Sequence, residues 1–74
     1  MSSKYQKAFM QFLSEAKELA DATSAEFELS DEILNSVLVS GEIVGQDTKE
    51  KLEKISKKNG LLFIANDLTI LYRT

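Results

Sequence analysis

The chain contains no cysteine and no histidine among its 74 residues. Disulfides, thiolate ligands and imidazole ligands are therefore excluded, and with them the usual zinc sites. The same absences remove Ser-His and Cys-His nucleophile pairs and the imidazole general base. Carboxylates remain, but a carboxylate active site needs a cleft, which so short a chain rarely encloses. We therefore expect no metal site, no other cofactor and no enzymatic activity.

Long apolar runs are missing as well. No stretch of the chain approaches the roughly 18 apolar residues needed to cross a bilayer. Near the N-terminus, polar residues interrupt the continuous apolar core that a secretory signal requires: Lys4, Gln6, Lys7, Gln11 and Ser14. We expect a cytoplasmic protein without a membrane partner.

The short length leaves little margin for folding. Seventy-four residues make a single small domain, residues 1–74, without room for a second core. Domains of this size often gain stability from disulfides, a metal or a partner chain, and the first two are excluded here. Good packing or association with another chain remains.

The N-terminal segment has the clearest periodicity. Its apolar residues recur at helical spacing: Tyr5, Ala8, Phe9, Phe12, Leu13, Ala16, Leu19 and Ala20. Ser2 or Ser3 can cap the start, and no glycine or proline interrupts the stripe. The pattern predicts a helix over about residues 3–22.

The next segment has two interpretations. Apolar residues alternate with glutamates in the run Ala25-Glu26-Phe27-Glu28-Leu29. This alternation is typical of a short half-buried strand over residues 25–29. Alternatively, Thr23 and Glu26 form a capping box that opens a helix. Three alternations do not decide between the two.

Two shorter helices are predicted further along the chain. Ser30, followed by two acids, can cap a helix over about residues 31–39, whose apolar face is Ile33, Leu34, Val37 and Leu38. Asp47 and Glu50 form a capping-box pattern that predicts a helix over about residues 48–59. Gly60 then suits the left-handed position after a helix.

The C-terminal segment predicts a β-hairpin with strands 61–65 and 68–73, because Asn66-Asp67 tolerates positive φ. One face of this hairpin is expected to pack on the core. The other face is also unusually apolar and includes Leu62, Ile64 and Leu71. These three side chains are either covered by the first helix or form a self-association surface. The fold class is therefore α+β, with the long helix packed across the hairpin.

What the chain does have is charge that is sorted along its length. Residues 14–47 carry nine acids and one base, whereas residues 48–74 carry six bases and three acids. Such separation creates a field that affects partner choice and encounter rate. The acidic segment predicts a partner-binding patch for a basic protein surface, made of Glu15, Glu18, Glu26, Glu28, Asp31 and Glu32. A plain solubility surface is the alternative interpretation.

A basic stripe gives a competing candidate site. Lys51, Lys54 and Lys58 fall at i, i+3 and i+7 and share one face of the predicted third helix. A basic helix followed by a hairpin is the arrangement with which winged-helix domains bind DNA. An ordinary solvated helix is the alternative, because Glu50 and Glu53 stand among the lysines and the only arginine lies at the C-terminal end.

These observations favour a small non-enzymatic regulator or inhibitor that binds a basic protein through its acidic patch. The alternative hypothesis is a winged-helix-like nucleic-acid-binding regulator that uses the basic helix and the hairpin. A homodimer formed through the apolar hairpin face is a further prediction.

Overall fold

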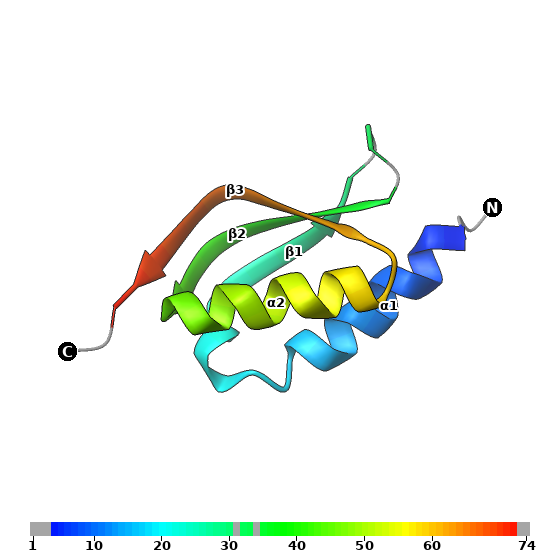
Figure 1. Cartoon of the computed structure of the whole chain (residues 1–74). Coiled ribbons are helices and arrows are strands. Elements are labelled where there is room, and N and C mark those ends of the chain that lie inside the picture. Colours follow the sequence, from blue (N-terminus) through cyan, green and yellow to red (C-terminus); the bar gives the residue numbers. More distant parts are fainter. Residues whose placement is uncertain (1–3, 31, 34, 73–74) are drawn as a thin grey trace.

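The computed structural model describes residues 4–30, 32–33 and 35–72. Its elements, in chain order, are helix α1 (Lys4–Ala16), the 3-10 helix η1 (Ala20–Ala22), strands β1 (Ala25–Leu29) and β2 (Ser36–Val44), helix α2 (Gln46–Lys58) and strand β3 (Leu62–Leu71) (Figure 1). The predicted α+β class is confirmed. No helix among the described residues is both long and apolar enough to span a membrane.

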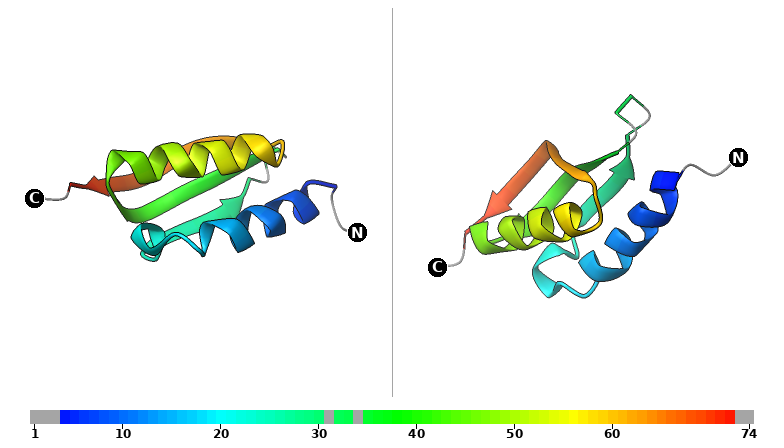
Figure 2. Two further views of the ribbon diagram at one scale, coloured as in Figure 1. Left: turned by 60° about the horizontal axis from the view of Figure 1, so that its bottom comes forward. Right: turned by 45° about the vertical axis from the view of Figure 1, so that its right-hand side comes forward.

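The strands form a three-stranded mixed sheet in the order β1-β2-β3. β1 runs antiparallel to β2, and β3 runs parallel to β2. Parallel neighbours need a crossover connection, which α2 supplies between β2 and β3. Both helices lie on the same side of the sheet (Figures 1 and 2). Among the described elements, no helix covers the other face.

The predicted helix over residues 31–39 is wrong, because strand β2 begins at Ser36 and occupies the last four residues of that segment. Val37, Val39 and Ile43 are fully buried. They are β-branched and lie on one side of the strand, where a pleated sheet accommodates such side chains well. The hydroxyl of Ser30 does accept bonds from two following amides, at 3.2 and 3.0 Å, but these close a turn before the strand.

Two residues assigned to that predicted helix, Asp31 and Leu34, lie outside the described residues. The alternative of a strand over residues 25–29 is confirmed, because β1 spans these residues. β1 and β2 pair in a register that places Phe27 opposite Val39. Strand β1 is stable because β2 provides its antiparallel partner.

The predicted C-terminal hairpin is also wrong. Both of its expected strands belong to the single strand β3, which pairs with β2. While β2 advances from Val39 to Gly41, β3 advances from Ala65 to Leu68, so β3 contains one extra residue. This is a β-bulge, and Asp67 has a φ of 59° in it. The positive φ expected at this point is present, but it forms a bulge instead of a turn.

The two other predicted helices exist with different bounds. α1 ends at Ala16, because the amides of Glu18 and Leu19 bond to carbonyls three residues earlier and tighten the chain. α2 begins at Gln46, after Gly45 in the N-cap position, and no side-chain cap bond forms there. The expected Asp47–Glu50 capping box is therefore absent, and the helix starts earlier than predicted.

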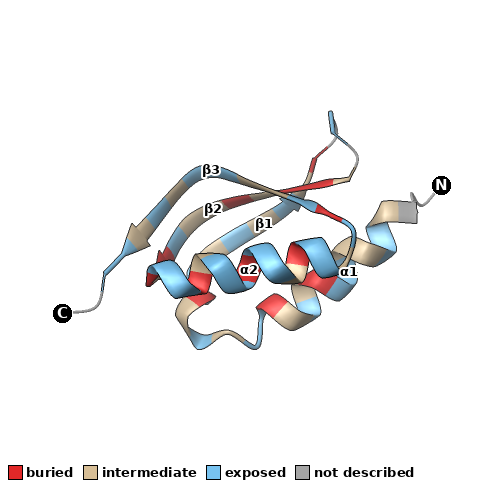
Figure 3. Ribbon diagram, viewed as in Figure 1, coloured by how far each residue is buried: buried red, intermediate tan, exposed pale blue. Residues whose placement is uncertain are grey.

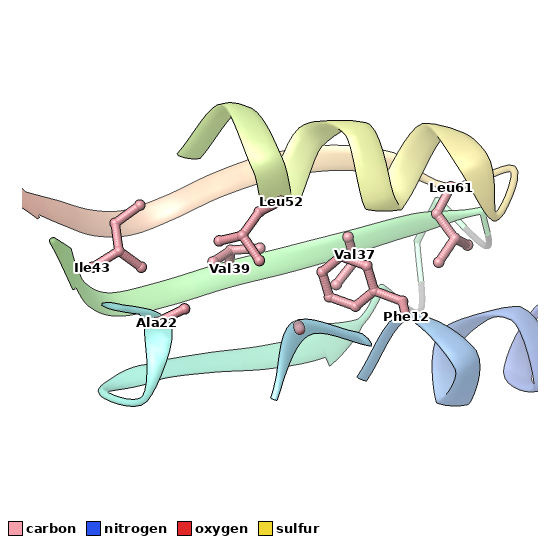
Figure 4. Close-up of a cluster of buried hydrophobic side chains, with 8 residues drawn as sticks. Phe12, Ala22, Val37, Val39, Ile43, Leu52 and Leu61 are labelled. Atoms are coloured by element: carbon pink, nitrogen blue, oxygen red, sulfur yellow. The ribbon is translucent and has the colours of Figure 1, made fainter. Parts of the chain in front are cut away.

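The core lies between the two helices and β2. Its buried apolar side chains are Phe12, Ala16, Ala22, Val37, Val39, Ile43, Leu52 and Leu61. Figure 4 shows those that it labels pointing toward one another from α1, η1, β2, α2 and the connection before β3. The rings of Phe12 and Phe27 pack edge to face, with centroids 5.2 Å apart. α1 packs against β1 and α2, and α2 covers β3, so the expected packing of the long helix across a hairpin does not occur.

Replacing Phe12 with alanine should cost about 3–5 kcal/mol in the free energy of unfolding, because it leaves a cavity at the centre of the core. Met10 is 63% exposed on the same helix, so Met10→Ala should change stability by no more than about 0.5 kcal/mol. Urea denaturation measures both values. Equal losses at the two positions would contradict this core.

Gly41 is held in a conformation that alanine tolerates poorly. Its φ is 84°, and a Cβ there would lie 2.5 Å from the carbonyl oxygen of Ser24. Gly60 has a similar φ of 73° but no atom within 4 Å of such a Cβ. Gly60→Ala should therefore cost about 1–2 kcal/mol from the left-handed backbone alone. Gly41→Ala should cost clearly more in the same denaturation experiment, and an equal cost would contradict the close approach of β2 to the chain before β1.

Candidate interaction surface

The sheet face opposite the helices is the candidate functional site, and it is called the open face below. Successive side chains of a strand point to opposite faces, so the neighbours of the buried core residues lie on this face. Its residues are Glu26 and Glu28 of β1, Leu38, Ser40, Glu42 and Val44 of β2, and Leu62, Ile64, Thr69 and Leu71 of β3. Figure 3 shows buried positions along the central strand β2, whereas β1 and β3 carry only intermediate and exposed positions.

Cross-strand pairing places acidic and apolar side chains beside one another on the open face. Glu28 lies opposite Leu38, which in turn lies opposite Ile64 on β3. Glu26 lies opposite Ser40. Both glutamates are exposed, and both aliphatic side chains are half-buried. On the open face, the two carboxylates of β1 therefore lie next to the aliphatic side chains of Leu38 and Ile64.

A hollow of about 260 Å³ lies on the open face between β1 and the bulge of β3. Its lining residues are Glu26, Phe27, Glu28, Leu38, Ser40 and Asn66. Two carboxylates, one hydroxyl and one amide surround an aliphatic side chain there. This set of groups suits a cation with an apolar stem better than it suits an anion.

The structure divides the predicted acidic patch. Glu26 and Glu28 are together on the open face, whereas Glu15 belongs to α1 on the helical side. Glu18 is exposed in the turn after α1, and Glu32 is exposed in the turn before β2. Asp31, the sixth member of the patch, lies outside the described residues. A single partner surface can therefore contact the β1 pair without contacting Glu15.

Glu15 is occupied by contacts within the chain. Its carboxylate accepts hydrogen bonds from the Lys58 ammonium at 2.7 Å and from the Asn59 amide at 3.0 Å. These two hydrogen bonds, with that of Lys58 the stronger, hold the pKa of the Glu15 carboxyl below its usual value. The contacts join the end of α1 to the end of α2, so the role of Glu15 here is structural.

The lysines of the competing site lie on α2. Lys51, Lys54 and Lys58 are all exposed, and Lys58 is engaged by Glu15. The C-terminal segment that was expected to form the wing is the single strand β3 and not a hairpin, so the wing of the expected winged-helix arrangement is missing. What remains is a helix face with mixed charge on the side of the sheet opposite Glu26 and Glu28.

The three predicted self-association residues lie on the open face of β3. Leu62 is 54% exposed, Leu71 is 43% exposed, and Ile64 is half-buried. In a regular strand Leu71 would lie on the opposite face from Leu62 and Ile64, because its number is odd and theirs are even. The extra residue of the bulge shifts the alternation by one and so keeps all three side chains on the same face. The helix α1 does not cover them.

Several residues of the open face were not foreseen. Leu38 was missed because residues 31–39 were assigned to a helix, and Asn66 because it was assigned to a turn; Ser40 and Glu42 follow the predicted helix, where no strand was expected. The alternation of Val37, Val39, Gly41 and Ile43 with Ser40 and Glu42 was a partial signal for a strand, but the apolar residues Leu38 and Val44 weaken it. A strand assignment there would have revealed the face.

Within the described residues, no cluster of three or more potential metal-ligating side chains is present. No family model, curated protein or solved structure matches the chain. The function must therefore be inferred from the open face itself.

The Glu15 contacts have a testable pH dependence. Lys58→Met should raise the pKa of Glu15 toward its ordinary value, whereas Lys54→Met, on the same helix, should leave it unchanged. A carboxylate whose pKa is lower in the folded state stabilises the fold above its unfolded pKa and loses that contribution as the pH falls through the folded pKa. Lys58→Met should accordingly lower stability at about pH 7 and not at about pH 2. An NMR titration of the Glu15 carboxyl that is identical in both variants would contradict the contact.

Proposed function

We propose that this domain is a small non-enzymatic regulator that binds a basic protein through the open face of its sheet. The observation that carries the proposal is the position of Glu26 and Glu28 beside Leu38 and the hollow. Of the predicted acidic patch, the proposal retains only Glu26 and Glu28, which lie on the open face. We place this function in the cytoplasm, in keeping with a sequence that lacks cysteine.

The chemistry of the open face supports a partner with lysine or arginine side chains. Such a side chain can lay its aliphatic stem on Leu38 and direct its charged end to the carboxylates of Glu26 and Glu28. Neither glutamate has an intramolecular salt bridge among the described residues, so both remain available for a cationic group. Glu42, which is exposed further along β2, extends the negative field. Charge of this kind speeds encounter with a basic surface.

A nucleic-acid-binding function is the competing proposal, and it now rests on Lys51, Lys54 and Lys58 alone. Two glutamates share that helix, and no wing adjoins it. Self-association is a separate proposal, because it uses the edge strand β3 and not the glutamates of β1.

Affinity capture from host cells tests the proposed function when three baits are compared. The first is the unchanged domain, the second is Glu26→Lys/Glu28→Lys, and the control is Glu50→Lys/Glu53→Lys. Both variants change the net charge equally, and all four positions are exposed. A true partner should be retained by the unchanged domain and by the control and be lost from the open-face variant. Its association rate should fall on the order of tenfold or more at low salt, and less at high salt.

Circular dichroism confirms that each bait is folded. Partners that bind all three baits equally would contradict a role for the open face. If Lys51→Glu/Lys54→Glu/Lys58→Glu removes binding instead, and nucleic acid accompanies the unchanged domain with a steep salt dependence, the nucleic-acid proposal replaces this one.

A further inference from the structure

None of the described strands lies beside the outer edge of β3. β3 is the last strand in the order β1-β2-β3, and it pairs with β2 on one side only. The Leu62 amide donates to the Asn35 carbonyl at 2.7 Å, and the Leu71 carbonyl accepts from the Gly45 amide at 2.7 Å. Both ends of β3 therefore direct these backbone groups inward, toward β2 and the residues that flank it.

The direction of the backbone groups alternates along a strand, so the residues next to these two point outward. On the N-terminal half of β3 they are Phe63 and Ala65, and on the C-terminal half they are Leu68 and Ile70. The bulge separates the two pairs. Free backbone donors and acceptors on a long strand are a template for pairing with another strand.

We propose that two copies of the chain pair antiparallel along β3, with Asn66 of one copy opposite Asp67 of the other. In this register Phe63 lies opposite Ile70 of the second copy, and Ala65 lies opposite Leu68. All four have outward backbone groups, so these become the hydrogen-bonded pairs of an antiparallel ladder. The two sheets join into one continuous sheet with all helices on one side.

The side chains fit the same register. Leu62, an exposed leucine at one end of β3, comes to lie opposite Leu71 of the second copy, so the two large exposed aliphatic side chains of the strand cover each other. Ile64 lies opposite Thr69. At the centre Asp67 meets an asparagine and not a second carboxylate, which avoids direct like-charge pairing.

The bulge selects this register. A shift by one residue would place Leu62 opposite Ile70, whose side chain lies on the helical face, and would mismatch the faces along both halves. A bulge usually protects an edge strand from pairing. Here the two bulges meet at the two-fold axis, so they interrupt the ladder at one point and leave both halves free to pair. The interface is isologous and closes at two copies.

Engineered disulfides test the register, because the chain contains no cysteine of its own. In Leu62→Cys/Leu71→Cys the two thiols of one chain are about 30 Å apart along the strand, so any disulfide must join two copies. Opposite positions in a non-hydrogen-bonded pair are about 4.5 Å apart between Cα atoms, which a disulfide can span. The control, Leu62→Cys/Thr69→Cys, places its thiols diagonally and should cross-link far less.

Sedimentation of the unchanged chain up to about 100 μM should show dimer, since an interface of one strand pair is small and its affinity modest. Ala65→Pro removes an outward amide that β2 does not use, and it should shift the chain to monomer without unfolding it. If this variant does not fold, Leu62→Glu tests the same edge at an exposed position. A strictly monomeric chain, a dimer that survives both edge variants, or equal cross-linking of the two cysteine pairs would overturn the proposal.

Discussion

The packing of strand β2 is the constraint on which the fold depends most, because this strand supplies three of the fully buried apolar side chains of the core and pairs with both other strands. Its fully buried residues Val37, Val39 and Ile43 face Phe12 of α1 and Leu52 of α2, and both other strands pair with its two edges. Burial of each of these aliphatic side chains contributes about 1.5–3 kcal/mol. In a chain without cysteine, and hence without a disulfide, the burial of this apolar strand is a large part of what stabilises the fold.

The position of β2 also determines which surfaces remain free. Both helices pack on the side where Val37 and Val39 lie, so the opposite side chains of the strands form a face that no described helix covers. The parallel pairing of β3 leaves that strand at an edge, with outward backbone groups along it. The acidic open face and the β3 edge are thus two consequences of one packing arrangement.

Local signals were sufficient for some elements and insufficient for others. The apolar stripe of α1, the end of α2 before Gly60 and the alternation of β1 can all be recognised from neighbouring residues. β2 could not be separated from a helix in this way, because Ile33, Leu34, Val37 and Leu38 also fit helical spacing. Its strand conformation depends on β1 and β3, which are distant in the sequence.

The hairpin error has the same physical origin. Asn66-Asp67 does favour a positive φ, and Asp67 adopts one, but a bulge and a tight turn need the same backbone conformation. A two-residue turn and a one-residue bulge also divide the flanking side chains between the two faces in the same way. Leu62, Ile64 and Leu71 were therefore correctly placed on one face, although the strand that pairs with them is β2 and not the other arm of a hairpin. The position of Glu26 and Glu28 on one face of a strand also followed from the sequence, whereas the hollow beside them required the fold.

NMR spectroscopy of the unchanged chain tests the central position of β2 most directly. The account predicts that amides of β2 exchange slowest with solvent and that side-chain contacts connect Val37 with Phe63 and Ile43 with Ile70, as parallel pairing requires. Helical contacts between residues three apart over 31–39, with no contact between Val37 and Phe63, would contradict it. In that case neither the open face nor the β3 edge would exist in the form described.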